Sequence, residues 1–459
     1  MAMGIRLFFS GFLLFLLTGS AFAQKMERYG QVLAFQIKTE LQSDSFPAMV
    51  TNKDWAGGRI VSLESNSNYG QTLTSGVRRG WSFFLQPNGA LGWNLGNEKQ
   101  RVDYLPTRKR RINDGRWHEV TCLFDLEQEA MWLWMDGEHL TTYNLKGMNI
   151  DSVMISADVE ATQRSDIKVR KLHWDTRHRE RWKPEETVEA INVVNWNIWH
   201  GGRHNGGQDG VRDVIRILSE QDPDIICLQE TYGSGPILAD SLGMIFYSIS
   251  SNLSILSKYP ILRIYNHGWD SFRFGGANIQ IGEEQSIAVF DIWLHYLPNT
   301  DQMLKEQMPM GDFMAAEMRT RGREMLLVHK AIRQLGLVPS VPRLIAGDFN
   351  SGSHLDWTAR TARKHGNQVV HWPASRTMVR EGYRDVWRTM HPDEVAEPGY
   401  TWSPRFRDQL QYRIDYIYTD QQNWSYLAST IQGYELGEKW PSDHAMVTAR
   451  LQLTDPVRP

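Results

Sequence analysis

Residues 344–350 read Leu-Ile-Ala-Gly-Asp-Phe-Asn, an apolar run that ends in a carboxylate and an amide. The apolar residues predict a short buried strand, and Asp348 and Asn350 stand at its carboxyl end. The same arrangement occurs upstream, where Ile225–Leu228 leads to Glu230. One polar side chain at a strand end is usually a cap, so the repetition of the pattern is what carries information.

Four further strand-like runs in the second half of the chain end in, contain or follow the same kinds of side chain. They carry Asn197 after Val193-Val194, His295 after Ile292-Trp293-Leu294, Asp415 within Arg413–Tyr418, and Asp443-His444 before the final strand at 446–449. Hard cations prefer oxygen ligands, so this set suits Mg²⁺, Mn²⁺ or Ca²⁺ rather than zinc. The sequence therefore predicts a divalent-cation site where these strand ends meet.

Helical periodicity separates these strands. Apolar residues from Val211 to Leu218 keep the i, i+3, i+4, i+7 spacing of an amphipathic helix, which ends at Asp222-Pro223-Asp224. A second helical pattern runs from Met325 to Leu335 and closes near Gly336. Strands that alternate with helices from residue 191 onward predict a layered α+β domain.

Five short motifs occur in one order over the last 270 or so residues, and together they resemble the endonuclease/exonuclease/phosphatase superfamily. They are Trp196-Asn197, Leu228-Gln229-Glu230, Gly347-Asp348-Phe349-Asn350, Arg413-Ile414-Asp415-Tyr416 and Ser442-Asp443-His444. That superfamily includes deoxyribonuclease I, exonuclease III, sphingomyelinases and inositol-polyphosphate 5-phosphatases. The resemblance implies a four-layer α/β/β/α sandwich over residues 191–459, with a phosphoester-hydrolysing site at one end.

The resemblance also implies a metal site. Glu230 would hold the cation, Mg²⁺ or Mn²⁺, with support from Asn197 and Asp443. Hydrolysis of a phosphoester needs an activated water and neutralisation of charge on the phosphoryl oxygens, and a bound cation helps with both.

The remaining motif residues receive catalytic roles from the same resemblance. Asp348 would orient or deprotonate the attacking water, and Asn350 would donate a hydrogen bond to the phosphate. His444, oriented by Asp415, would stabilise charge on the scissile phosphate. His295 matches the second histidine of the deoxyribonuclease I and sphingomyelinase branches, whereas abasic-site nucleases have tyrosine in that region.

Three more residues are candidates for the substrate side of the site. His200 follows the first motif strand, His354 follows Asn350 closely, and Trp402 could stack on a substrate. Arg319 and Arg323 are read as a helix surface, with a phosphate contact as the alternative.

The first half of the chain follows a different pattern. Short apolar runs alternate with turn signals such as Pro87-Asn88-Gly89 and Asp136-Gly137, which predicts an all-β sandwich over residues 24–176. Asp114–Val120 and Met135–Gly137, with Asn52–Trp55 and Gly80–Phe83, resemble the concanavalin-like, laminin-G-like jelly-roll family. That resemblance implies either a glycan-binding domain, with Ca²⁺ at Asp54, or a spacer. The basic run Arg108–Arg111 is read as a solvated loop, with an anionic polymer as the alternative partner.

The sequence also indicates an N-terminal signal segment, a linker between the two halves and the state of the two cysteines. Residues 1–23 are typical of a cleaved secretory signal, with Arg6, an apolar run and Ala21-Phe22-Ala23. The run is shorter than the roughly 20 residues that span a bilayer, so we expect a secreted or periplasmic protein without a transmembrane segment. Residues 177–190 are charged and contain proline, which predicts a linker between halves that each bury their own core. Cys122 and Cys227 lie in apolar runs and are expected to be buried and unpaired.

Composition limits the function. Hydrophobic residues are 41% and charged residues 22%, typical of a soluble globular protein. A net charge of −3 lacks the basic footprint of a dedicated nucleic-acid binder. The favoured hypothesis is a secreted phosphodiesterase or phosphatase acting on a lipid, glycan or polyol phosphate. An extracellular nuclease is the alternative, and a glycan-binding adhesin with an inactive hydrolase domain is the third.

Overall fold

A computed structural model describes residues 25–52, 79–97, 101–107, 110–148, 159–181, 188–266, 268–282 and 285–454. The expected signal segment, Asp54 and residues 182–187 of the expected linker lie outside these ranges. No helix within the described ranges is long and apolar enough to cross a membrane.

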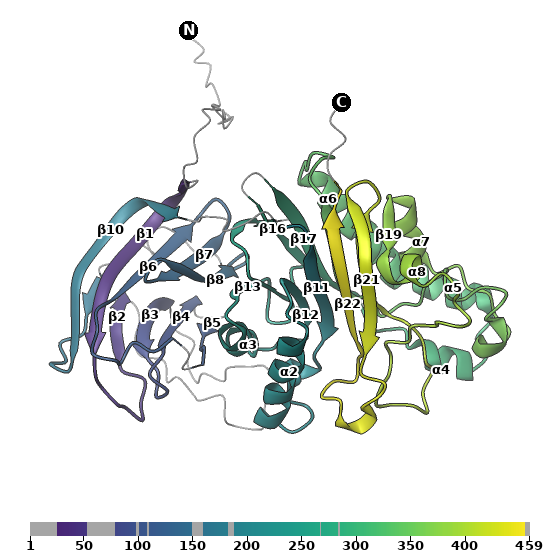
Figure 1. Cartoon of the computed structure of the whole chain (residues 1–459), viewed down its shortest axis with the longest axis horizontal. Helices are drawn as coiled ribbons and strands as arrows, with labels where there is room; N and C mark the ends of the chain where they lie inside the picture. Colours follow the sequence, from purple (N-terminus) through teal and green to yellow (C-terminus); the bar gives the residue numbers. More distant parts are fainter. Residues whose placement is uncertain are drawn as a thin grey trace, which may run out of the picture.

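Two antiparallel sheets form the N-terminal half (Figure 1). One has the order β5-β4-β3-β2-β9 and consists of β5 (Arg101–Tyr104), β4 (Leu91–Asn97), β3 (Arg79–Leu85), β2 (Ala48–Asn52) and β9 (Val159–Ala161). The other has the order β10-β1-β6-β7-β8 and consists of β10 (Ile167–Arg181), β1 (Lys25–Thr39), β6 (His118–Asp125), β7 (Ala130–Met135) and β8 (Glu138–Asn144). The predicted turn at Gly89 joins β3 to β4, with a φ of 89° that favours glycine.

Large aromatic side chains fill the space between these two sheets. Phe35 of β1 meets Phe83 of β3 edge to face, with ring centroids 5.3 Å apart. Trp81 and Trp93 are fully buried in the same core. The N-terminal half is therefore a two-sheet β structure, while the jelly-roll strand order implied by the resemblance remains a prediction.

The C-terminal half contains two packed sheets. The first has the order β13-β14-β12-β11-β22-β21 and consists of β13 (Ile245–Ser248), β14 (Ser254–Ser257), β12 (Ile225–Gln229), β11 (Ile191–Asn197), β22 (Met446–Leu453) and β21 (Trp424–Gln432). The second has the order β15-β16-β17-β18-β20-β19 and consists of β15 (Ile261–Ile264), β16 (Phe274–Gln280), β17 (Ser286–Trp293), β18 (Arg343–Asp348), β20 (Asp415–Asp420) and β19 (Tyr383–Asp385). Val193 and Ile225 of the first sheet share a core with Val289 and Leu344 of the second.

Helices cover both outer faces, which confirms the predicted α/β/β/α sandwich. Against the first sheet lie α2 (Gln208–Glu220) and α3 (Gly235–Leu242). Against the second lie α6 (Arg323–Gln334) and α7 (Pro373–Arg380), beside α8 (Val386–Met390). The rest are α4 (Thr300–Lys305), α5 (Met310–Glu317), the π-turn η2 (Met318–Gly322), and the 3₁₀ turns η1 (His200–Gly202), η3 (Ala362–His365) and η4 (Gly437–Lys439).

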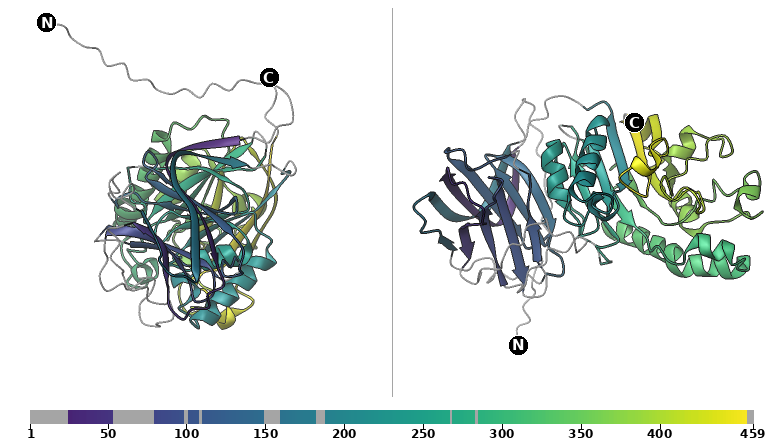
Figure 2. Two further views of the ribbon diagram at one scale, coloured as in Figure 1. Left: turned by 90° about the vertical axis from the view of Figure 1, so that its left-hand side faces the viewer. Right: turned by 90° about the horizontal axis from the view of Figure 1, so that it is seen from below.

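The two halves share one sheet, contrary to the expectation of separate cores. β8 pairs in parallel with β13, so the N-terminal and C-terminal strands make a continuous 11-stranded sheet (Figures 1 and 2). Trp132 and Trp134 of β7 belong to the same buried cluster as Ile255 of β14. The free edge of β8 explains the difference, because an edge strand offers unpaired backbone groups to a neighbouring strand.

The expected start of the linker is also wrong. Residues 177–181 are the end of β10, and they pair with β1 in the register Lys25↔Arg181. Their charged side chains had indicated a loop, but β10 is the edge strand of the sheet, and an edge strand tolerates charge along its exposed side.

Candidate active site

The carboxyl ends of β11, β12, β17 and β18 meet at one end of the C-terminal sandwich. β11 and β12 are parallel with Asn197 opposite Gln229, and β17 and β18 are parallel with Trp293 opposite Asp348. The Asn197 amide donates to Asp348 Oδ2 at 3.1 Å and so joins the two sheets. The predicted convergence of these polar strand ends is therefore present.

His444 is bound to a buried carboxylate. Its Nδ1 lies 3.1 and 2.9 Å from the two oxygens of Asp415, and both side chains are almost completely buried. Burial by itself lowers the pKa of His444, but Asp415, Asp348 and Asp443 outweigh it and raise the pKa well above its usual value. The raised pKa favours the cationic imidazole, whose Nδ1 donates to Asp415. Its Nε2 lies 3.8 Å from Asp348 and 4.0 Å from Asp443.

Asp348 faces that cation. Its Oδ2 lies 3.8 Å from His444 Nε2, and its Oδ1 accepts a hydrogen bond from the Asn350 backbone N–H at 2.8 Å. Burial raises the pKa of Asp348, and the positive charge of His444 opposes that rise. The structure thus brings a carboxylate of raised basicity beside a fixed imidazolium.

Glu230 lies on the other side of Asn197. Its Oε1 accepts from the Asn197 amide at 3.2 Å, and its Oε2 accepts from the His200 N–H at 3.1 Å. Glu230 has a φ of 56°, an uncommon conformation for a residue with a side chain, at the point where β12 ends. The local backbone thus turns the Glu230 carboxylate toward Asn197 and the site.

Asp443 completes the cluster. Its Oδ1 lies 4.0 Å from His444 Nε2, is buried, and receives no hydrogen bond from the described residues. Burial raises the pKa of Asp443 to about 7, and the nearby charge of Glu230 contributes to the rise. The charge of His444 opposes that rise, and Asp443 Oδ1 remains without a hydrogen-bond donor among the described residues.

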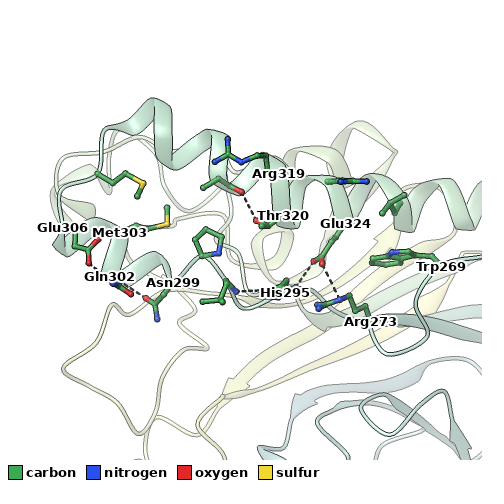
Figure 3. Close-up of a pocket in the computed structure, with 16 residues that line it drawn as sticks. Trp269, Arg273, His295, Asn299, Gln302, Met303, Glu306, Arg319, Thr320 and Glu324 are labelled. Atoms are coloured by element: carbon green, nitrogen blue, oxygen red, sulfur yellow. Dashed lines mark hydrogen bonds and ion pairs between the residues drawn. The ribbon is translucent and has the colours of Figure 1, made fainter. Parts of the chain in front are cut away.

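Asn350 and His295 lie at the edge of this cluster. The Asn350 amide donates to the Leu294 carbonyl at 2.9 Å and to Asp348 Oδ2 at 3.1 Å, so it ties the end of β18 to the chain after β17. His295 Nδ1 accepts the Leu297 N–H at 2.9 Å, which leaves its Nε2 as the donor of the neutral ring. His295 lines a groove beside the cluster (Figure 3).

Two of the three predicted rim residues contact the cluster. Besides its N–H bond to Glu230, His200 stacks on Tyr232 with ring centroids 5.4 Å apart. Trp402 meets the His444 ring at 4.9 Å in an edge-on contact. His354 instead bonds Ser375 of α7 through Nδ1 at 2.8 Å, and no contact described for it reaches the cluster.

Comparison with known proteins places the chain in a family. The sequence profile described as the Endonuclease/Exonuclease/phosphatase family matches residues 194–444, which is more than half of the chain. The chain belongs to this family. Members are metal-dependent phosphoester hydrolases, and the six residues of the cluster, with Asn350 and His295 at its edge, lie within the matched range.

Individual relatives are distant. An uncharacterized Caenorhabditis elegans protein, F14F9.5, is 28% identical over 293 residues, which cover 57% of this chain and 91% of the relative. An AP endonuclease from Archaeoglobus fulgidus is 18% identical with a TM-score of 0.40, covering 56% of this chain and 98% of that one. The human Nocturnin catalytic domain is 13% identical with a TM-score of 0.38, covering 58% and 95%.

The donor set of this family member fits a hard divalent cation. Glu230 and Asp443 supply carboxylate oxygens, and the Asp443 Oδ1 has no donor among the described residues. Asp348, Asp415 and His444 also place one ligand atom each within 4.8 Å of one another. In that second group His444 Nδ1 and both Asp415 oxygens are already engaged with one another, at 3.1 and 2.9 Å. Glu230, Asp443 and the Asn197 side chain therefore remain the residues that would hold Mg²⁺ or Mn²⁺.

A buried clamp beside the site could not be seen in the sequence. Arg321 of η2 donates to the backbone carbonyls of His295 and Tyr296, both at 2.8 Å, and it pairs with Glu317. Glu317 in turn accepts from Ser351 at 3.2 Å, so one ion pair fixes both the His295 loop and the loop after β18. The regular spacing of Arg319, Arg321 and Arg323 gave no sign that the middle one points inward.

A second hidden feature lies beneath Asp348. Gln229 donates to Asn195 at 2.9 Å and to Asp291 at 2.6 Å, which links the two sheets through buried polar groups. Burial raises the pKa of Asp291 well above its usual value, and the hydrogen bond from Gln229 opposes that rise. In the sequence, the feature that could have indicated this buried link is Asp291, a single acidic residue within the apolar run of β17.

Proposed function

We propose that this protein hydrolyses a phosphoester by direct attack of water, with a divalent cation bound at Glu230, Asp443 and Asn197. The observation that carries the proposal is the buried set Asp415–His444–Asp348, in which an imidazolium and a basic carboxylate face the same space. An ion pair buried this deeply is costly to build for stability alone, and perturbed charges of this kind are typical of catalytic sites.

The residues have separable roles in this reaction. Asp348 accepts the proton of the attacking water, because its raised pKa makes it a better base than an exposed carboxylate. His444 donates from Nε2 to a phosphoryl oxygen as negative charge develops there, and Asp415 holds its ring and charge in place. When bound, the cation supplies further neutralisation of the phosphoryl oxygens.

The finer assignment is also a proposal. The substrate is taken to be a lipid, glycan or polyol phosphate, and the place of action to be outside the cytoplasm. The leader-like sequence at residues 1–23 and the slight net negative charge support this choice over a nuclease. The N-terminal half is proposed to bind a glycan or to act as a spacer for the catalytic half.

A matrix of metals and substrates tests the proposed function. The purified full chain is incubated with Mg²⁺, Mn²⁺, Ca²⁺ or EDTA, and with DNA, RNA, sphingomyelin, inositol phosphates and sugar phosphates. We expect release of phosphate or alcohol from a lipid, glycan or polyol phosphate with Mg²⁺ or Mn²⁺, and its loss in Asp348→Asn. Efficient cleavage of DNA or RNA alone would favour the nuclease, and inactivity toward every phosphoester would contradict hydrolysis.

A further inference from the structure

A groove of about 690 Å³ opens beside the catalytic cluster. His295, which follows β17, lies midway along it, with Trp269 and Arg273 toward one end and Met303 and Glu306 toward the other (Figure 3). Glu230, Asp348 and His444 are not among the residues that line this groove. Its volume falls within the roughly 300–1,000 Å³ that small-molecule sites occupy, and it is too small for a folded partner.

One wall of the groove is a single helical face. Ala316, Arg319, Thr320, Arg323 and Leu327 follow one another at intervals of one, three or four residues along α5, η2 and α6. Such spacing places them on one side of a helix. The clamp at Arg321 fixes this helix to the His295 loop, so the wall has a defined position relative to the catalytic cluster.

The segment 297–308 forms a second wall, which carries apolar side chains as well as Asn299, Gln302 and Glu306. Leu297, Pro298, Met303 and Met308 line it, and Leu297 is 45% exposed and Met308 36% exposed. Exposed apolar side chains gathered in a concave site favour the carbon skeleton of a ligand. Methionine adapts its shape to irregular ligands, which suits this wall to such contacts.

Charges in the groove are only partly neutralised. Glu324 accepts the His295 N–H at 2.8 Å and lies 3.5 Å from Arg273 Nε. Glu324 and Arg273 therefore form an ion pair with each other. Glu306 accepts from Gln302 at 2.7 Å. Arg319 and Arg323 are exposed, and neither guanidinium has an ion pair or hydrogen bond within the described part of the chain. The groove therefore offers two unengaged cations beside the apolar side chains of the second wall.

We propose that this groove binds the part of a small phosphoester that lies beyond the scissile phosphate, and that Arg319 and Arg323 bind a second phosphate on it. This inference rests on the proposed function and narrows its substrate class to bisphosphorylated small molecules with a carbon chain or ring between the two phosphates. The apolar side chains of the second wall contact that carbon skeleton, and guanidinium groups suit phosphate oxygens through paired hydrogen bonds.

The test compares two probes that differ only in the second phosphate, hexane-1,6-diol bisphosphate and hexyl monophosphate. Affinity of the full chain for each is measured by isothermal titration calorimetry in EDTA, and kcat/KM for each is measured with Mg²⁺. We expect the bisphosphate to bind about tenfold more tightly than the monophosphate, since exposed charge pairs contribute only modestly to affinity. The ratio of affinities should fall to about one in Arg319→Gln/Arg323→Gln.

Lys330→Gln is the matched control, because it removes one positive charge from the same helix outside the groove and should keep the wild-type ratio. The two single arginine variants, each with a melting curve, cover the case in which the double variant does not fold. An unchanged ratio in the folded arginine variants would overturn the proposal.

Two further outcomes separate this proposal from its alternatives. If the arginine variants lose affinity for a single-stranded oligonucleotide and not for the bisphosphate, the groove follows a nucleic-acid backbone and the small-molecule assignment is wrong. If the affinity ratio behaves as expected while no phosphoester is hydrolysed, the groove stands and the proposed catalytic function fails.

Discussion

His444 is surrounded by three carboxylates, and that arrangement determines its charge. Asp415 lies 2.9 Å from Nδ1, while Asp348 and Asp443 lie 3.8 and 4.0 Å from Nε2. Each negative charge favours the protonated ring and raises its pKa. In the proposed mechanism a histidine in this setting acts as a hydrogen-bond donor rather than as a base, and Asp348 is the proposed proton acceptor.

Removing this donor should affect catalysis much more than folding. We expect His444→Ala to lower kcat/KM by about 10²- to 10³-fold, the usual cost of removing one donor that stabilises developing negative charge. Asp415→Asn should give a smaller loss, because the ring remains but its charge and orientation are less well supported. Steady-state kinetics and melting curves check both variants. A His444→Ala enzyme with normal turnover would contradict the assigned role.

The His295→Ala variant tests whether the site resembles the deoxyribonuclease I and sphingomyelinase branches or the exonuclease III type. His295 Nδ1 is occupied by the Leu297 N–H, so only Nε2 can donate to a substrate. We expect His295→Ala to cost about 10²-fold or more in kcat/KM. The double variant with His444→Ala should lose less than the product of the two losses, since both act on one transition state. His173→Ala, on exposed β10, is the control. Near-normal turnover in His295→Ala would place the site nearer the exonuclease III type.

At the scale of elements, sequence patterns predicted the strands better than the side-chain contacts. Apolar runs and the polar residues after them located β11, β12 and β18, because strand ends in this layered fold converge on one site. His354 was predicted to line the substrate side of the site because it follows Asn350 closely in sequence. In the structure its ring is hydrogen-bonded to Ser375 of α7 instead. The i,i+4 spacing of Glu317 and Arg321 is compatible with an exposed helix pair, and the carbonyl partners that bury Arg321 are marked by no residue pattern.

The layer of helices on the second sheet contains a pH-sensitive residue. His329 of α6 is 2% exposed, lies against Met378 and Tyr383, and burial lowers its pKa from 6.5 to about 4. Its unfolded-state pKa is the higher one, so the neutral ring stabilises the fold fully above pH 6.5. That contribution is lost as pH falls from 6.5 toward 4, because protons then favour the unfolded chain.

We therefore expect His329 to lower the free energy of unfolding across this window by up to about 3 kcal/mol. Asp443, whose pKa burial raises to about 7, opposes this change because it binds a proton in the folded chain. Burial also lowers the pKa of His354 and His365 to about 4. The pH dependence of the free energy of unfolding therefore has contributions from several residues. Denaturant titrations of the wild type and His329→Gln between pH 4 and 7.5 isolate its share. Identical slopes in the two proteins would refute it.

For the whole molecule, the joint between the halves matters most. Besides the β8–β13 pairing, Arg28 of β1 donates to the carbonyls of Ile261 and Leu262 at 2.6 and 2.9 Å. Asn144 of β8 donates to the Ile249 carbonyl at 3.2 Å. The sequence changes from a β-only pattern to an α/β pattern near residue 191, where β11 begins. It could not reveal that the two parts share a sheet, because strand pairing between distant segments leaves no local signal.

A fragment of residues 187–459 should accordingly be less stable than the full chain. It exposes the edge of β13 and the apolar surface that β7 and β8 cover, so we expect melting at least about 10 °C lower or aggregation. A full chain cut at an engineered protease site within residues 182–187 is the control, and its halves should stay together on size exclusion. A fragment that melts with the full chain would show that the halves are independent.

The dependence of hydrolysis on metal tests the central assignment most directly. Initial rates on the preferred phosphoester are measured against Mg²⁺ concentration for the wild type, Glu230→Gln and Glu220→Gln, the last being an exposed α2 residue as control. We predict no hydrolysis in excess EDTA and restoration by Mg²⁺ or Mn²⁺. Glu230→Gln should need at least about tenfold more Mg²⁺ for half-maximal rate, at an unchanged melting temperature. Full activity in excess chelator, or identical Mg²⁺ curves for the three proteins, would contradict the metal-dependent site.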